Sequence, residues 1–294
     1  MRLSSIKYTP TSLLNSNEEV AAIVCTNGIV PIPHLNKMFH TQWPEDLFNL
    51  IQSGELESLS QWYQVNGKRL ISEYQDLIIP QKDIHYAPLF RHPKKIFGIG
   101  LNYVDHATDL AEKAPTEIPA SFLKADTTII GHQDAIQLSP LSTRTTGEAE
   151  LGIILGKTTK NIDRENWLSV VAGFTTILDI TAEDILRQNP RYLTLAKNFD
   201  TFFSFGPEFV TPDEISDLQH ISVATILNGT IHAQNTIANM TFPPDFLVSF
   251  HSQIMTWQPG DILSTGTPRA VSLKSGDILE CHIDGFIPLI NPVI

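Results

Sequence analysis

Short apolar runs bounded by Gly, Pro, Asp or Asn dominate the chain beyond about residue 92. Such runs are typical of β-strands, because branched and aromatic side chains favour extended backbone and turn residues end it. The tetrapeptide Gly-Asp-Ile-Leu opens two of them, at 260–263 and 276–279, and predicts two successive strands of one sheet. We expect a β-rich unit with brief helices, whose strands include 95–101, 127–131, 150–156, 170–180, 221–229, 260–266 and 276–285.

The N-terminal part of the chain has a mixed pattern. Asn27-Gly28 lies between two apolar runs, and this dipeptide predicts a hairpin in which both residues adopt positive φ. Between Trp43 and about Gly67 apolar residues recur at helical spacing, which predicts short helices. This part is therefore expected to be a small α+β unit.

Prolines separate the two patterns. The segment 80–93 holds three of them, and proline interrupts both helices and inner strands. We therefore predict a small N-terminal α+β domain at 1–91 and a larger β-rich α+β domain at 92–294.

Composition and charge exclude several protein classes. Hydrophobic residues make up 42% of the 294 residues and charged residues 18%, which argues against disorder and coiled coil. The formal net charge of -12 repels nucleic-acid phosphates and anionic lipid, so neither nucleic acid nor a membrane is expected as a partner. A globular enzyme or binding protein remains.

The location expected from the sequence is the cytoplasm. The two cysteines, Cys25 and Cys281, form no CxxC pair, so neither a disulfide framework nor a cysteine zinc site is expected. The N-terminus lacks the apolar stretch of a signal peptide, and no uninterrupted apolar run approaches the length of a membrane span.

Two glutamates share one face of an expected strand. In the segment 147–156, strand alternation places Glu148 and Glu150 on the same side, about 7 Å apart along the chain. The apolar residues that follow carry this strand into a core, where two like charges repel by about 2 kcal/mol besides their desolvation. A divalent cation would offset both costs, and the alternative is a solvated strand end.

A third carboxylate, Asp179, closes the apolar run 170–180. Its alternative role is a turn cap, but residues 181–184 resemble a capping box, which assigns helix initiation to Asp184 and leaves Asp179 available. Three carboxylates without histidine or cysteine partners suit a hard ion such as Mg²⁺, Mn²⁺ or Ca²⁺ better than zinc.

Two further segments hold candidates for catalysis. If Asp105 caps a helix, His106 and Asp109 lie one turn apart on one face, and a carboxylate beside an imidazole raises its basicity, as a general base requires. An exposed capping segment is the alternative. Lys197, in the apolar stretch 195–207, is either an interior cation that binds an anion or a lysine whose ammonium reaches solvent.

Taken in order, these segments resemble the fumarylacetoacetate hydrolase family, in the branch that has a small N-terminal domain before the catalytic domain. Several motifs in the correct order are more specific than any one of them. The matching segments cover about 200 residues and read GLNYVDHA (100–107), SFLKADTTIIG (121–131), EAELGIILGK (148–157), VAGFTTILDITAED (171–184), LAKNFDTFFSFGP (195–207), LNGTIHAQNT (227–236) and PGDILSTGTP (259–268).

The resemblance implies a fold, an assembly and a metal. The fold implied for 92–294 is a mixed β-roll of sandwich type, and the assembly is a homodimer. The ligands implied for Mg²⁺, or for Mn²⁺ or Ca²⁺ in its place, are Glu148, Glu150 and Asp179.

The resemblance also implies catalytic and substrate-binding roles. His106 with Asp109 would activate water, and Lys197 would stabilise developing negative charge. The residues expected to bind substrate are Lys124, Thr265, Gly266 and Thr267.

The chain departs from the family pattern on the substrate side. Glu183 stands where the family has Arg and Leu186 where it has Gln, so a polar contact to substrate is lost or replaced. Asp109 is one methylene shorter than the usual Glu, and the Gly-Val-Gly expected after Thr-Gly-Thr-Pro reads Ala-Val-Ser at 270–272.

The function implied is a metal-dependent hydrolase that cleaves a carbon–carbon bond in an acylpyruvate or a related small diketo acid. An ion that chelates both oxygens of such a compound stabilises the enolate that must leave. Decarboxylation or keto–enol tautomerisation of a small oxo diacid such as oxaloacetate needs the same enolate without an attacking water. A non-catalytic member that binds metal and acids is a further alternative.

Overall fold

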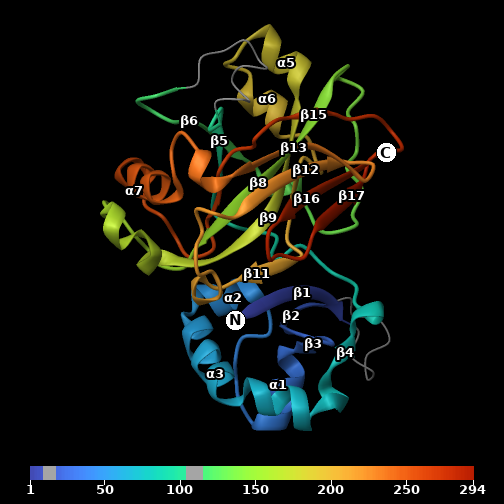
Figure 1. Ribbon diagram of the computed structural model, residues 1–294, viewed down its shortest axis with the longest axis vertical. Helices are drawn as coiled ribbons and strands as arrows, with labels where there is room; N and C mark the ends of the chain where they lie inside the picture. The colour runs from blue at the N-terminus through green and yellow to red at the C-terminus, as the bar shows by residue number, and fades with distance from the viewer. Residues whose placement is uncertain (9–17, 104–114) are drawn as a thin grey trace.

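The computed structural model describes residues 1–8, 18–103 and 115–294. Figure 1 shows a smaller N-terminal part beside a larger β-rich part. The elements of the N-terminal part are β1 (Arg2–Tyr8), β2 (Glu18–Cys25), β3 (Gly28–Pro31), α1 (Ile32–Phe39), α2 (Leu47–Gln52), α3 (Glu55–Glu73) and β4 (Ile79–Pro80).

Strands with short helices between them make up the larger part, as the apolar pattern predicts. Its helices are α5 (Glu183–Gln188), α6 (Leu193–Lys197) and α7 (Pro244–Ile254). Its strands are β5 (Ile96–Gly100), β6 (Ala120–Lys124), β7 (Ile129–Ile130), β8 (Thr145–Leu155), β9 (Val171–Ala182), β10 (Phe203–Phe205), β11 (Glu208–Val210), β12 (Ser222–Leu227), β13 (Thr230–Thr236), β14 (Ile262–Ser264), β15 (Val271–Ser272), β16 (Ile278–Ile283) and β17 (Leu289–Pro292).

The expected N-terminal hairpin is confirmed, but its turn lies one residue earlier. Cys25 pairs with Gly28, so the turn residues are Thr26 and Asn27, and only Gly28 of the expected pair has a positive φ, of 149°. Gly28 is instead required by close packing, because a Cβ there would lie 2.0 Å from the Ile79 carbonyl oxygen. The expected helices are confirmed as α2 and α3.

One large sheet runs through both parts of the molecule. Its strands follow the order β4-β3-β2-β1-β11-β9-β8-β14-β5-β6, and the link between the parts is the antiparallel pairing of β1 with β11. β8 and β9 pair antiparallel over almost their whole length, and all their residues are buried. These two strands are the central pair on which the site is built.

A smaller sheet, β13-β12-β16-β17, contributes to the core beside β8 and β9. Ala149 and Leu151 of β8 share a hydrophobic cluster with Leu279 of β16. Because side chains alternate along a strand, Glu148 and Glu150 lie on the opposite face of β8. The smaller sheet therefore holds one face of β8 in place while the other face carries the polar groups.

The two Gly-Asp-Ile-Leu segments belong to different sheets, so the expectation of one sheet is wrong. The first leads into β14 of the large sheet, where it pairs with β8, and the second leads into β16 of the smaller sheet. A tetrapeptide sets local extended backbone, whereas the pairing partner depends on contacts far away in the sequence.

The expected capping box before α5 is wrong as well. The N-cap of α5 is Ala182, which makes no side-chain hydrogen bond. Asp184 instead accepts hydrogen bonds from the Ser142 hydroxyl at 2.7 Å and from the Thr143 amide at 2.8 Å. Burial acts to raise the pKa of Asp184, but these hydrogen bonds lower it to about 2. Asp184 therefore ties the loop before β8 to α5.

The helices lie outside the paired strands. Figure 1 shows α5 and α6 together at one end of the larger part and α7 at its side. Within residues 1–8, 18–103 and 115–294, no helix has both the length and the apolar character that crossing a membrane requires.

Candidate active site and metal centre

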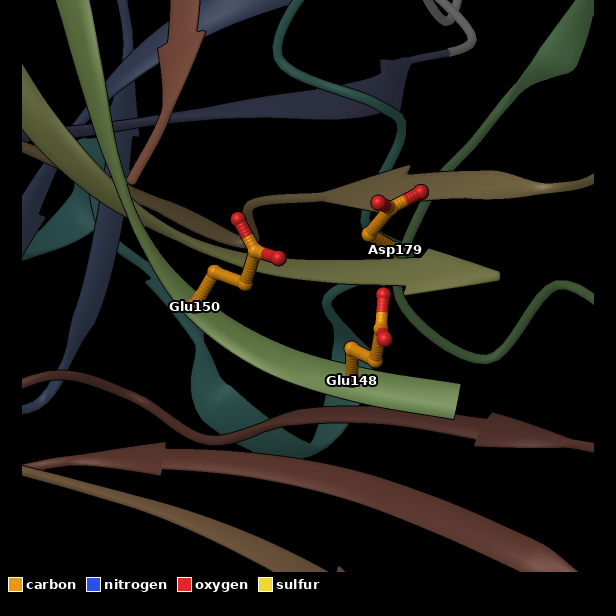
Figure 2. Close-up of side chains that lie close together, drawn as sticks. All are labelled: Glu148, Glu150 and Asp179. Atoms are coloured by element: carbon orange, nitrogen blue, oxygen red, sulfur yellow. The ribbon is translucent and has the colours of Figure 1, made fainter. Parts of the chain in front are cut away.

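Three carboxylates meet on the central strand pair. Glu148 of β8 lies directly opposite Asp179 of β9 in the register, and Glu150 is two residues further along β8. One carboxylate oxygen of each residue lies within 4.8 Å of those of the other two, and Figure 2 shows the three side chains close together. All three are buried, Asp179 to 1% exposure, so the alternative of a solvated strand end is wrong.

Two buried lysines partly neutralise this cluster. The Lys197 ammonium, at the end of α6, donates to Glu148 Oε2 at 2.9 Å and to Asp179 Oδ2 at 2.6 Å. The Lys124 ammonium, at the end of β6, donates to Asp179 Oδ1 at 2.5 Å and to the Ile180 carbonyl oxygen at 3.1 Å. Lys197 is therefore an interior cation rather than a lysine that reaches solvent, and its Nζ also lies 4.6 Å from the centre of the Phe122 ring.

The charges of the cluster move its pKa values in opposite directions. Burial acts to raise the pKa of Asp179, but Lys124 and Lys197 hold it below its usual value. Burial lowers the pKa of Lys124 to about 8, even though Asp179 favours its charged form. Burial also acts to lower the pKa of Lys197, but Asp179 and Glu148 hold that pKa above its usual value. Asp179 and Lys197 therefore form the firmly ionised pair.

Glu150 differs from the other two carboxylates because, within the described residues, Lys124 and Lys197 donate to Asp179 and Glu148 and not to Glu150. Its Oε2 accepts from the Ser264 hydroxyl at 2.5 Å and from the Gly266 amide at 2.8 Å. Burial, followed by the charges of Asp179 and Glu148, raises the pKa of Glu150 to about 8. Near neutral pH this carboxyl group retains a proton unless another cation replaces it.

The donor set fits a hard divalent ion. Oxygens that share an ion at about 2.1–2.5 Å lie at most about 5 Å apart, which the separation of up to 4.8 Å satisfies. With Glu150 ionised, three carboxylates against two ammonium groups leave a charge of -1, and a divalent ion makes it +1. A metal-loaded site would therefore attract an anion.

The loop after β14 supports the site mainly through its backbone. Gly266 has φ of 93° and its amide reaches Glu150, whereas Thr265 is fully buried and its hydroxyl donates to the Leu151 carbonyl oxygen at 2.9 Å. The side chain of Asn102 holds this loop, since its amide donates to the Thr265 carbonyl oxygen at 2.7 Å. Of the expected loop contacts, Thr267 lines the adjoining cavity, while Thr265 and Gly266 are not among its lining residues.

A cavity of about 250 Å³ opens on the carboxylate cluster. Glu148, Glu150 and Lys197 contribute polar groups to its wall, whereas Asp179 and Lys124, which donates to it, are not among the lining residues. Apolar side chains form much of the remaining wall, namely Ile99, Leu101, Phe122, Leu186 and Leu193. The cavity therefore suits a small compound with a charged group at the carboxylate cluster.

Glu183, which stands where the family pattern has an arginine, is bound by two arginines. Glu183 lines the cavity and is 6% exposed, and its carboxylate accepts hydrogen bonds from Arg144 Nε and from Arg187 Nε, the latter at 2.8 Å. Where the family pattern has an arginine, this chain therefore has a buried glutamate that holds two. Leu186, the second departure, adds an apolar group to the same wall.

The expected general base cannot be placed, because His106 and Asp109 lie outside the described residues. Three other contributors were not predicted from the sequence: Ser264, Phe122 and Arg187. Ser264 directly precedes the Thr-Gly-Thr-Pro loop, and the spacing of Glu183 and Arg187 is that of an ion pair along a helix. These two signals were present in the sequence, whereas nothing in it brings Phe122 to Lys197.

Comparison with known proteins gives consistent matches. The family model described as "Fumarylacetoacetate (FAA) hydrolase C-terminal" matches residues 95–294. The rat protein named oxaloacetate tautomerase Fahd2a, mitochondrial, is 34% identical over 225 residues, which cover 74% of this chain and 72% of that protein.

Two solved structures have a similar fold and cover most or all of this chain. The 5-carboxymethyl-2-hydroxymuconate delta-isomerase of Mycobacterium smegmatis is 30% identical with a TM-score of 0.66, over 74% of this chain and 82% of that one. The maleylpyruvate hydrolase of Sphingobium sp. SYK-6 is 25% identical with a TM-score of 0.78, over 100% of this chain and 99% of that one. This match therefore includes the N-terminal part.

Replacing Glu150 tests the metal centre. Glu150→Gln keeps the shape of the side chain and removes a ligand charge, so Mn²⁺ affinity measured by calorimetry should fall by at least about 100-fold. Glu165→Gln, at an exposed glutamate, is the matched control and should bind Mn²⁺ as the wild type does. Wild-type affinity in Glu150→Gln would exclude Glu150 as a ligand.

The raised pKa of Glu150 predicts a pH dependence of stability in metal-free protein. The folded state keeps this proton up to about pH 8, whereas the unfolded chain releases it near 4.5. The stabilisation is complete below the unfolded pKa and is lost as pH rises through the folded pKa, with a slope of at most about 1.4 kcal/mol per pH unit.

Glu150→Gln cannot release this proton and provides the comparison. Between about pH 5 and 8, the free energy of unfolding of the wild type should fall relative to that of Glu150→Gln in denaturant titrations. A difference that stays constant across this range would show that Glu150 is ionised in the metal-free fold.

Proposed function

Because this chain belongs to the fumarylacetoacetate hydrolase family, we propose that it is a divalent-metal-dependent enzyme that interconverts the keto and enol forms of a small oxo diacid such as oxaloacetate. The observation that carries this proposal is the buried cluster of Glu148, Glu150 and Asp179, joined by Lys197; Glu148, Glu150 and Lys197 line a small cavity. Lys197 stabilises negative charge on a bound compound directly, and the carboxylates would do so through the divalent ion that they hold.

The proposed ligands of Mg²⁺, or of Mn²⁺ or Ca²⁺ in its place, are Glu148, Glu150 and Asp179. When bound, such an ion supplies Lewis-acid stabilisation of the negative charge that an enolate carries on oxygen. The carboxylates would hold the ion beside the cavity, and the Lys197 ammonium is a second positive charge next to them. Lys197 thereby opposes the repulsion between the carboxylate cluster and an acidic substrate.

The surrounding residues position these groups and restrict water. Lys124 donates a hydrogen bond to Asp179, and the Gly266 amide and Ser264 hydroxyl orient Glu150. Phe122 lies against the Lys197 ammonium and covers one side of the cavity. A low-dielectric wall strengthens each charge interaction inside it.

Tautomerisation needs fewer groups than hydrolysis. A proton moves between carbon and oxygen of the substrate, and no water attacks a carbonyl carbon. The described residues already include charge stabilisation for the enolate. The similarity to the rat protein named as an oxaloacetate tautomerase, at 34% identity, supports the same reaction.

Carbon–carbon bond hydrolysis of an acylpyruvate is the second candidate. It is favoured by the segment that carries His106 and Asp109, where the imidazole would take a proton from the attacking water. It is also favoured by the match over 100% of this chain to a protein named as a maleylpyruvate hydrolase.

We propose further that the active form is a homodimer in the cytoplasm, with a catalytic domain at 92–294 and a small N-terminal domain at 1–91. The low cysteine content supports the compartment. The cavity volume of about 250 Å³ supports a small-molecule substrate.

A substrate panel tests the reaction. With added Mn²⁺ or Mg²⁺, the protein should accelerate the loss of oxaloacetate enol absorbance without forming pyruvate, and chelation of the metal should abolish this. Acylpyruvate cleavage to two acids would instead support hydrolysis. Absence of turnover with every compound, in protein that binds Mn²⁺, would overturn both proposals in favour of a non-catalytic binding protein.

Replacing Lys197 tests its role toward substrate. Lys197→Met removes the ammonium at similar length, so kcat/KM for a carboxylate substrate should fall by at least about tenfold more than for its neutral ester. Lys82→Met, at an exposed lysine of the N-terminal part, is the control. An unchanged preference between acid and ester would limit Lys197 to a structural role.

A further inference from the structure

A cationic cluster borders the cavity where β9 passes into α5. Glu183 accepts from Arg187 Nε at 2.8 Å and pairs with Arg187 Nη2 at 2.5 Å, both through Oε1, and its Oε2 accepts from Arg144 Nε. The Glu183 side chain is 8% exposed, whereas the two arginine side chains are about half exposed. Two guanidinium groups against one carboxylate leave a net charge of +1 at this position.

Arg187 is the arginine that faces the cavity. It lines the wall together with Glu183 and Leu186, whereas Arg144 is not among the lining residues. Its Nε and Nη2 groups are used by Glu183. Within the part of the chain that the structure describes, no hydrogen bond is recorded for Arg187 Nη1, so its N–H groups remain for an anion.

The surrounding contacts hold Arg187 in place before any ligand arrives. Glu183 and Arg187 are four residues apart on α5, and the Glu183 backbone N–H donates to the Arg144 carbonyl oxygen at 2.9 Å. The neighbouring Asp184 binds the loop at Ser142 and Thr143. A guanidinium held in this way loses little conformational entropy when it binds a carboxylate.

The cavity therefore has two charged positions and an apolar portion of its wall. Glu183 lies four positions after Asp179, which corresponds to at most about 13 Å along the chain. Ile99, Phe122 and Leu193 line the same cavity. A compound that carries one anionic group at the metal centre and a second at its other end complements this arrangement.

We propose that Arg187 binds the second carboxylate of the substrate and thereby makes the enzyme selective for dicarboxylic 2-oxo acids. Glu183 is a positioning residue, because it acts through Arg187. The inference rests on the proposed function, since the first carboxylate and the oxo group must occupy the metal centre.

The test compares diacids with monoacids of the same chain length. Binding to Mn²⁺-loaded protein is measured by calorimetry for 2-oxoglutarate against 2-oxopentanoate and for 2-oxoadipate against 2-oxohexanoate, with ligand-into-Mn²⁺ titrations subtracted. In the wild type at least one diacid should bind about tenfold more tightly than its monoacid, a modest effect because Arg187 is half exposed. Each ratio is measured on one protein sample, so a partial loss of stability does not alter it.

Three variants identify the residue. Arg187→Gln should abolish the diacid preference and leave monoacid affinity unchanged, and Arg187→Lys should restore part of the preference. Arg191→Gln, an exposed arginine near the end of α5 that is not among the lining residues, makes the same change in net charge and should keep the wild-type ratio.

The outcomes separate this inference from the proposed function. Wild-type protein that prefers no diacid, Arg187→Gln that keeps the wild-type ratio, or Arg187→Gln that weakens both acids equally overturns the inference alone. Wild-type protein that binds Mn²⁺ but none of the four acids also overturns the inference, whereas the proposed function fails only if the same protein does not turn over oxaloacetate.

Discussion

The burial of three carboxylates on one strand pair is the constraint on which the rest of this structure depends. Glu148 and Asp179 face each other across β8 and β9, and Glu150 follows on the same side. Their mutual repulsion and desolvation would oppose folding unless cations lay beside them. Lys124 and Lys197 supply those cations from β6 and α6, two elements that are distant in sequence.

The two lysines neutralise only two of the three carboxylates, and the metal-dependent chemistry depends on the third, Glu150. Two ammonium groups serve Asp179 and Glu148, while Glu150 remains in a site that favours its proton. Replacing that proton by a divalent ion changes the net charge of the three carboxyl groups and two lysines from 0 to +1, which attracts an acid. The same arrangement that limits the cost of folding therefore supports a metal-dependent enzyme of oxo acids.

The substitution of Glu183 for the arginine of the family pattern has a counterpart in the structure. A lone buried glutamate would repel an acidic substrate, but Arg144 and Arg187 both bind it. The position as a whole remains cationic, with the charge carried one helical turn further along α5. A comparison of position 183 alone with the family pattern indicates the loss of an arginine, whereas in the structure Arg144 and Arg187 replace its positive charge.

Part of this structure could be predicted from relations between neighbouring residues in the sequence. Strand alternation places Glu148 and Glu150 on one face, and this depends only on neighbouring residues, so the sequence determined it without a fold. The β-rich character of the larger part and the helices α2 and α3 follow in the same way from periodicity and turn residues. The residues alone indicated Asp179 as a third carboxylate, the family resemblance added Lys197 to the same site, and the structure places the two together.

Other features depended on which elements pair, and only the tertiary structure decided them. The two Gly-Asp-Ile-Leu segments entered different sheets, and Asp184 bound a loop rather than starting a helix. Lys124 reached Asp179 across 55 positions of sequence. The physical reason is that local backbone preference is a property of a few adjacent residues, whereas register, burial and charge pairing arise from contacts between segments that only the folded chain brings together.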